Sequence, residues 1–255
     1  MFFRYLLLTL TINTIPSSAL ADEFHLQLCN ISANEAAKRL GFQESSKEIK
    51  AISYFDTTNL SYLKQGAIIR FRESTDKVDL TIKVRKKQTK DILPESSQEI
   101  KCEHDHYINR SVQSCSIKKK YSLQESFPNL PTIERIKKLL TNAQITYLNH
   151  HIKEPLQWNL LQEFGPVPTH IFEKKGFENN LKEVGQNKIK LKLEHRNKYP
   201  LTIVELSFKD TTDQFTANRK KLVEKINSLG LKSCALQNSK TKLTIEYLNN
   251  WLHKL

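Results

Sequence analysis

Cations alternate with apolar residues in two neighbouring segments of this sequence. In AIIRFR, Arg70 and Arg72 are two positions apart, and in LTIKVR the same spacing separates Lys83 from Arg85. Side chains of a β-strand alternate between the faces of a sheet, so residues two apart share a face. The pattern therefore predicts two strands that are apolar on one face and cationic on the other. Such cations suit a phosphate-rich polyanion, because guanidinium groups bind phosphate through two hydrogen bonds.

Carboxylates occupy strand-like segments elsewhere in the chain. They are Glu23, Glu99, Glu103, Glu194 and Glu205. Carboxylate oxygens are ligands for Mg²⁺ or Mn²⁺, and these ions bridge phosphate oxygens and orient water. If the strands close into a barrel with polar faces inward, the channel would contain both phosphate-binding cations and metal-binding acids. An open sheet with solvent-facing cations, or an edge strand protected by charge, is the structural alternative.

The elements that must position these residues alternate between groups of strands and helices. Strands are expected over residues 23–28, 51–55, 67–73, 78–84, 97–103, 114–121, 170–175, 188–194 and 201–208. A helix is expected after the capping box of Ser32 and Glu35, and others over residues 132–140, 213–230 and 240–255. This order predicts an α+β fold with a large antiparallel sheet.

The ordered motifs resemble those of the CYTH, or triphosphate tunnel metalloenzyme, family. YFDTTNLSYLKQGAIIRFR is similar to its Y-x-D-T turn and R-x-R strand, and LTIKVR to its T-x-K strand. EIKCE, KLKLE and VELSF resemble its acidic strands, and Ser239-Lys240 its Ser-Lys pair before the last helix. The resemblance implies one domain over residues 22–255. Its fold would be a closed antiparallel eight-stranded β-barrel, forming a tunnel, with flanking helices.

The resemblance also implies a metal-dependent hydrolase that acts on a triphosphate, polyphosphate or nucleotide. The implied phosphate-binding residues are Arg70, Arg72, Lys83, Lys190 and Lys240. The implied ligands of a divalent Mg²⁺ or Mn²⁺ ion are Glu23, Glu99, Glu103, Glu194 and Glu205. Lys83 and Glu205 are expected to take part in catalysis, whereas Asp56 is expected to support the turn.

Two strands depart from the family pattern. The first strand has Glu23, His25 and Gln27 where the family has E-x-E-x-K, and Ser207 replaces a later carboxylate. Fewer acids should weaken Mg²⁺ binding, although a neutral His25 could bind a transition metal. A polyanion-binding tunnel without catalysis is therefore the alternative to an enzyme.

The chain has 255 residues and a formal net charge of +13, which favours an acidic partner. A basic RNA- or surface-binding module would explain the charge but not the ordered motifs. Only Tyr121 adjoins the run Lys118–Lys120, so the aromatic residues that stack on bases are lacking and no specific nucleic acid is expected. His104 and His106 lie between two cysteines in an expected polar loop. Without a further ligand, their H-x-H spacing is a weak metal motif.

Residues 1–21 have the layout of a secretory signal peptide: Arg4, an apolar run and an Ala19-Leu20-Ala21 ending. Cleavage after Ala21 would give an exported protein, periplasmic or secreted, without stable membrane insertion; an uncleaved anchor is the alternative. Four cysteines fit an oxidising compartment and allow three disulfide connectivities. The hairpin-length segment between Cys102 and Cys115 favours their pairing, which leaves Cys29 with Cys234.

Overall fold

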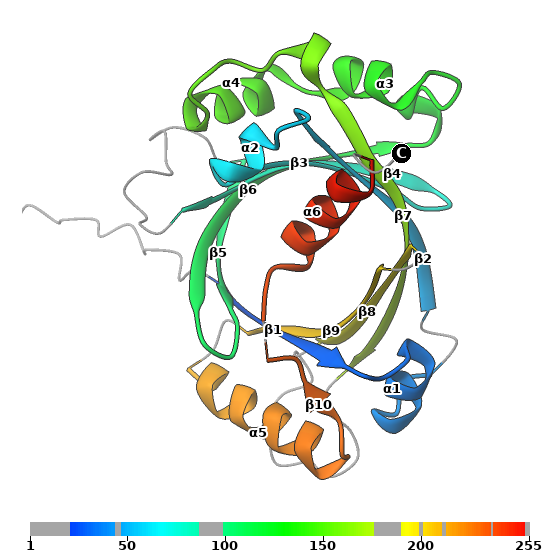
Figure 1. Ribbon diagram of the computed structural model, residues 1–255, viewed down its shortest axis with the longest axis vertical. Helices are drawn as coiled ribbons and strands as arrows, with labels where there is room; N and C mark the ends of the chain where they lie inside the picture. The colour runs from blue at the N-terminus through cyan, green and yellow to red at the C-terminus, as the bar shows by residue number, and fades with distance from the viewer. Residues whose placement is uncertain are drawn as a thin grey trace, which may run out of the picture.

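The computed structural model describes residues 21–43, 47–86, 99–175, 190–198, 201–210, 213–235 and 237–252. Within these ranges, nine strands close into a barrel in the order β1-β5-β6-β4-β3-β2-β7-β8-β9, and β9 pairs again with β1 (Figure 1). Their bounds are β1 (Ala21–Cys29), β2 (Lys47–Asp56), β3 (Ala67–Glu73), β4 (Lys77–Lys86), β5 (Ile100–His106), β6 (Ser111–Ser122), β7 (Gln162–Lys175), β8 (Lys190–Lys198) and β9 (Leu201–Asp210). A short tenth strand, β10 (Lys232–Ser233), pairs with β1.

The barrel differs from the predicted one in strand number and direction. It has nine strands rather than eight, and it is mixed rather than antiparallel because β1 and β5 run parallel. Their pairing extends from Ala21 opposite Glu103 to Phe24 opposite His106. Antiparallel neighbours can be joined by a tight turn, but a parallel pair leaves no such signal in the sequence. We call this parallel pair of strands the β1–β5 seam.

Helices cover two opposite sides of the barrel, and one helix lies inside it (Figure 1). One side is covered by α1 (Ala33–Arg39) and α5 (Phe215–Ser228), and the other by α3 (Thr132–Leu139) and α4 (Asn142–His151). The short α2 (Ser61–Lys64) connects β2 to β3, and α6 (Lys240–Leu252) enters the barrel. Ile245 and Leu248 of α6 pack against Ile52 and Tyr54 of β2 and Phe164 of β7.

The outward faces of the strands supply two further hydrophobic clusters. Phe71 and Ile82 belong to the cluster that includes Ile136 of α3. On the other side, Phe24 and Phe208 belong to the cluster that includes Leu222 of α5. Burial of each such side chain stabilises the fold by about 1.5–3 kcal/mol. Because these alternate residues face outward, the polar residues between them face the barrel interior.

Helix α4 was not among the predicted elements, although it begins with a clear capping signal. Thr141 and Gln144 form a reciprocal capping box at its start. Gln144 is fully buried, and its side-chain Nε2 donates to the carbonyl oxygens of Leu80 and Ile117 at 3.1 and 3.4 Å. Its apolar residues do not form one clear stripe, so a helix-period pattern is weak here.

The two disulfides confirm the expected pairing. Cys102 and Cys115 face each other across β5 and β6, and Cys29 of β1 is bonded to Cys234. The segment between Cys102 and Cys115 was predicted to be a polar loop. Part of it is instead strand, because β5 continues to His106.

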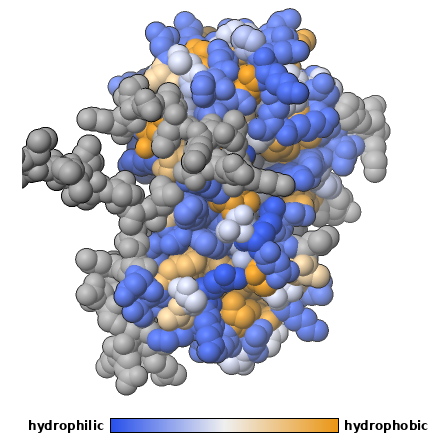
Figure 2. Space-filling model, turned by 90° about the vertical axis from the view of Figure 1, so that its left-hand side faces the viewer, coloured by the Kyte–Doolittle hydropathy of each residue, from blue (hydrophilic) through white to orange (hydrophobic). Residues whose placement is uncertain are grey.

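Hydrophilic residues dominate the described part of the face drawn in Figure 2, with small hydrophobic areas between them. Among the described residues, no helix has both the length and the apolar character needed to cross a bilayer.

Candidate functional site

The inward faces of the strands line an interior that we call the tunnel. On β3 and β4, the inward positions carry Arg70, Arg72, Lys83 and Arg85, in agreement with the alternation in the sequence. Lys83 lies opposite Ile68, and Thr81 lies opposite Arg70. The strand period therefore places these four cations on one wall of the tunnel.

Arg70 and Arg72 of β3 form an arginine pair that has no counter-charge within ion-pairing distance among the described residues. The Nε atom of each guanidinium is buried and has no hydrogen-bond partner in the part of the chain that the structure describes. Burial, together with the neighbouring charges of Arg72 and Arg196, lowers the pKa of Arg70 to about 9. An unpaired buried donor is costly, and a bound anion would remove that cost.

The opposite wall is acidic and centres on His25 of β1. Its Nδ1 atom lies 3.0 Å from Glu205 Oε1, and its Nε2 atom lies 3.6 Å from Asp105 Oδ1 and 4.0 Å from Glu23 Oε2. Burial alone would lower the pKa of His25, but Glu23, Glu205 and Asp105 raise it to about 9. At neutral pH, His25 is therefore an imidazolium surrounded by three carboxylates.

Lys83 is held by acids of β5. Its Nζ atom lies 2.7 Å from Glu103 Oε1 and 3.2 Å from Asp105 Oδ2. Burial would raise the pKa of Glu103, but Lys83 and Lys209 lower it to about 2. Lys83 likewise keeps the pKa of Asp105 well below its usual range, against the opposing effect of burial. Both carboxylates are therefore ionised, and Lys83, together with Lys209 beside Glu103 and Arg85 beside Asp105, compensates their charge.

Lys240, the first residue of α6, occupies the equivalent position on the other side of His25. Its Nζ atom donates to Glu194 Oε2 and Glu205 Oε1, each at 2.7 Å. Burial opposes ionisation of both acids, but Lys240 is the main cause that lowers the pKa of each, to about 2 for Glu205. Lys83 and Lys240 thus face the tunnel as predicted, but they bind carboxylates.

Of three further residues considered in the sequence, one lies apart from this network, one has a side chain outside the described residues, and one has another role. Glu99 is exposed and precedes β5. Lys190 begins β8, but its side chain lies outside the described residues. Gln27 faces inward beside α6, where its backbone N–H and carbonyl bond to the Gln237 side chain at 2.9 and 3.1 Å. Gln27 therefore anchors the segment that leads into α6.

Asp56 supports the turn between β2 and α2. Its carboxylate accepts hydrogen bonds from the backbone N–H groups of Thr57, Tyr62 and Leu63 at 2.7, 3.0 and 2.8 Å. These contacts fix the start of α2 and hence the entry into β3. The geometry agrees with the supporting position expected from the Y-x-D-T motif.

Two buried residues of the network were missed at the sequence level. Asp105 is fully buried and contacts Lys83, Arg85 and His25. Arg196 is fully buried, donates to Glu194 Oε1 at 2.9 Å and contacts the Tyr54 hydroxyl. Each lies two residues beyond a motif that was recognised, EIKCE or KLKLE. Extending the strand alternation by one step would have found both.

The acidic wall has a donor set that fits a divalent metal. Glu23, His25 and Asp105 each offer a ligand atom, and these atoms lie within 4.8 Å of one another. Two carboxylates and an imidazole suit Mn²⁺ better than Mg²⁺, which prefers oxygen ligands. Since a metal-bound imidazole must be neutral, the ion would replace the proton of His25.

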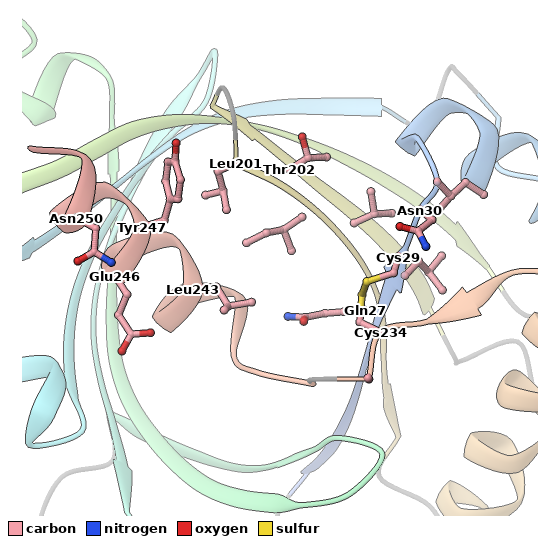
Figure 3. A pocket seen from close by; sticks show the side chains of 15 residues that line it. Gln27, Cys29, Asn30, Leu201, Thr202, Cys234, Leu243, Glu246, Tyr247 and Asn250 are labelled. Carbon is pink, nitrogen blue, oxygen red and sulfur yellow. A yellow bond between two sulfur atoms is a disulfide. The ribbon is translucent and has the colours of Figure 1, made fainter. Parts of the chain in front are cut away.

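A separate cavity of about 860 Å³ lies beside α6. Leu201 and Thr202 of β9, Gln27 of β1, and Leu243 and Tyr247 of α6 line it, close to the Cys29–Cys234 disulfide (Figure 3). Its lining contains neither the arginine pair nor the acids around His25. It is thus distinct from the charged site.

The chain matches no protein family model and no curated protein, but its fold matches solved structures. HpAC1 from Hippeastrum, reported to have a dominant triphosphatase activity, is 13% identical, with 87% of this chain and 93% of HpAC1 covered and a TM-score of 0.55. A candidate adenylate cyclase from Bacillus halodurans is 12% identical, with 88% and 96% covered and a TM-score of 0.50. At these identities the likeness is one of fold. The chain therefore shares the barrel fold of these two proteins, and the resemblance predicted from the sequence is supported at the level of the fold alone.

Proposed function

We propose that this protein binds a triphosphate, polyphosphate or nucleotide triphosphate group in the tunnel. The observation that carries the proposal is the arginine pair, Arg70 and Arg72, whose buried Nε donors have no partner among the described residues. Phosphate oxygens would accept from both guanidiniums and supply the missing negative charge. The fold of HpAC1, a protein with triphosphatase activity, supports the same ligand class.

The reaction proposed for this site is hydrolysis of the terminal phosphoanhydride. A divalent ion held by Glu23, His25 and Asp105 would neutralise phosphate oxygens and orient water. Arg70 and Arg72 hold the terminal phosphate. The water oxygen bonds to the terminal phosphorus as the bridging P–O bond breaks, which gives phosphate, the shortened chain and a proton. Lys83 and Lys240 lie where they can neutralise the leaving group once they exchange a carboxylate contact for a phosphate contact.

Phosphate release tests the proposal. Tripolyphosphate, ATP and thiamine triphosphate are incubated with the protein, with Mg²⁺, with Mn²⁺ and with neither ion. We expect turnover that depends on the metal and falls at least tenfold in Glu23→Gln, which removes one ligand charge. Absence of turnover together with micromolar tripolyphosphate binding would contradict hydrolysis but not binding. Loss of both would contradict the whole assignment.

A second candidate function is binding without turnover, and His25 specifically favours it. The imidazolium of His25 and the ammonium of Lys83 already neutralise Asp105, one of the carboxylates that would hold a metal. An acidic wall balanced in this way does not need an ion. In this case metal chelation with EDTA would leave tripolyphosphate affinity unchanged.

We also propose that the protein is exported. The two disulfides are compatible with an oxidising compartment, periplasmic or extracellular. Residues 1–20, which contain most of the predicted signal peptide, lie outside the described residues. Mass spectrometry of the secreted or periplasmic protein should find Asp22 as the first residue, and a retained Met1 would contradict cleavage.

A further inference from the structure

The outer face of the β1–β5 seam carries a second cluster of possible metal ligands. Asp22 of β1 lies opposite His104 of β5, and Phe24 lies opposite His106. His104 and His106 are two residues apart on one strand, so their side chains share a face. The same alternation places Glu23, His25 and Asp105 on the inner face. Asp22, His104 and His106 therefore form a cluster outside the tunnel, which we call the outer cluster.

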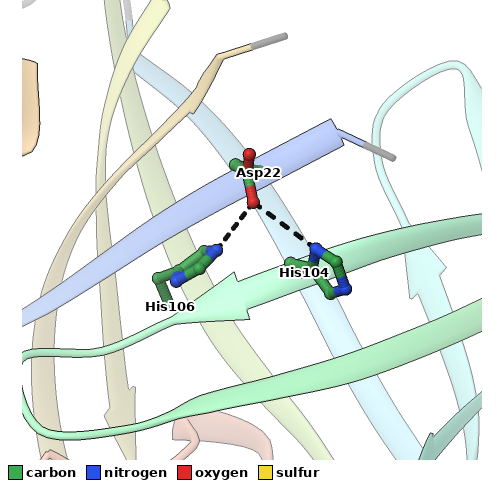
Figure 4. A group of neighbouring side chains, drawn as sticks. All are labelled: Asp22, His104 and His106. Carbon is green, nitrogen blue, oxygen red and sulfur yellow. Dashed lines mark hydrogen bonds and ion pairs between the residues drawn. The ribbon is translucent and has the colours of Figure 1, made fainter. Parts of the chain in front are cut away.

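The three side chains converge on one carboxylate oxygen (Figure 4). Asp22 Oδ1 lies 2.7 Å from His106 Nε2 and 3.6 Å from His104 Nδ1. The three candidate ligand atoms lie within 4.8 Å of one another. In a tetrahedral zinc site, with Zn–N of 2.0–2.1 Å, ligand atoms are about 3.3 Å apart. Side-chain rotations that move the ligand atoms by about an ångström or two would therefore suffice to place them around one ion.

The side chains of the outer cluster are accessible to an ion, and one of them is held by packing. The side chains of Asp22, His104 and His106 are 30%, 40% and 22% exposed. The ring of His106 packs against Phe215 at the start of α5, with 4.7 Å between ring centroids. In the described part of the chain, Asp22 forms ion pairs only with the two histidines. No described lysine or arginine competes for this carboxylate.

We propose that Asp22, His104 and His106 bind a transition-metal ion of the zinc class and thereby cross-link the β1–β5 seam. Imidazole nitrogen is a preferred ligand of Zn²⁺, Cu²⁺ and Ni²⁺, and a single carboxylate completes a three-ligand set with a fourth position for water. Mg²⁺ and Ca²⁺ prefer oxygen ligands and are excluded by the two imidazoles. The ion would join the strand that carries His25 to the strand that carries Asp105. This proposal does not depend on triphosphate binding.

Calorimetric titration with ZnCl₂ tests the site, with protein that carries no histidine tag. We expect one Zn²⁺ per chain at the outer cluster with a micromolar or lower Kd, and at least a tenfold weaker Kd in Asp22→Asn and in His104→Gln. His150→Ala, a substitution of an exposed histidine on α4, is the matched control and should bind like the wild type. Glu23→Gln, which alters only the inner cluster, should also keep the outer ion.

Two further measurements keep the test independent of folding defects. At a hundredfold excess over the wild-type Kd, Zn²⁺ should raise Tm of the wild type by about 5 °C and that of His104→Gln by no more than about half as much, while the Tm values without metal stay alike. Cu²⁺ bound to the wild type should show nitrogen hyperfine coupling from two imidazoles in its electron paramagnetic resonance spectrum. Zn²⁺ affinity that is unchanged in both Asp22→Asn and His104→Gln, or that is lost only in Glu23→Gln, would overturn the proposal.

Discussion

The two walls of the tunnel differ in how their charges are compensated. On β3, Arg70 and Arg72 are partly buried and have no ion-pair partner among the described residues. The acids of the opposite wall, by contrast, are paired with cations: Lys83 of β4, His25 of β1 and Lys240 of α6 bind Glu103, Asp105, Glu205 and Glu194. Paired buried charges stabilise one another, whereas an unpaired buried cation is tolerated at a cost. The acidic wall therefore holds the barrel together, and the arginine pair is available to a ligand.

The largest expected effect comes from removing the arginine pair. Arg70→Ala with Arg72→Ala should weaken tripolyphosphate binding by roughly 10²–10⁴-fold, since each charge-assisted hydrogen bond contributes about 1.5–3 kcal/mol. The stability of the folded protein should change little or rise, because two like charges are removed. Calorimetry with tripolyphosphate and thermal unfolding measure the two quantities. Unchanged affinity would remove the arginine pair from the site.

Asp105→Asn tests the acidic wall, where a substitution should lower the stability of the folded protein. The substitution leaves Lys83, Arg85 and His25 without their shared carboxylate, and loss of one partner from a buried charge network costs about 3–5 kcal/mol. We expect a marked loss of stability in denaturant unfolding. A change below 1 kcal/mol would show that these contacts do not support the fold. The matched control is Asp76→Asn, an exposed acid in the β3–β4 turn.

The pH dependence of stability should reveal the protonated His25. Its pKa is raised to about 9 in the folded protein, against about 6.5 when unfolded. Its contribution is therefore fully present below pH 6.5 and is lost as pH rises through 9, a change of roughly 3 kcal/mol. Denaturant unfolding between pH 6 and pH 10 measures this slope. In His25→Gln the decline should disappear, and a wild type equally stable at pH 6 and pH 9 would contradict the imidazolium.

The smallest effect is expected for Lys209→Ala. Lys209 contacts Glu23 and Glu103, but its side chain is 54% exposed, so solvent screens both contacts. Ion pairs of this kind contribute about 0–1 kcal/mol. Thermal unfolding should detect a loss in that range, alongside the larger loss for Asp105→Asn. Equal losses for the two variants would mean that burial does not distinguish the members of the acidic wall.

The sequence predicted local features better than long-range ones. The alternation in AIIRFR and LTIKVR correctly gave the faces of Arg70, Arg72 and Lys83, because side-chain direction in a strand depends only on the strand itself. Strand pairing depends on distant residues, so the parallel β1–β5 seam was missed, and the nine strands expected from the sequence were assigned to an eight-stranded barrel. The position of α6 was missed for a related reason. An amphipathic stripe indicates that a helix face is buried, but not that it enters a barrel.

The candidate site shows the same division. Inward positions could be read from the strand period, but the pairing of Lys240 with Glu194 and Glu205 joins three elements and has no local signature. His104 and His106 were interpreted as an exposed loop pair because their third neighbour, Asp22, lies on another strand. The roles of the individual residues in binding and catalysis remain predictions for the experiments above.

The Cys29–Cys234 disulfide has a consequence for the unfolded chain. It links residues 205 positions apart, and so joins the first strand of the barrel to the segment that precedes α6. Most of the polypeptide is thereby a covalent ring. By the chain-entropy relation, a ring of this size reduces the freedom of the unfolded state by about 5 kcal/mol. The barrel is thus closed twice, once by hydrogen bonds between β1 and β9 and once by a covalent bond that survives unfolding.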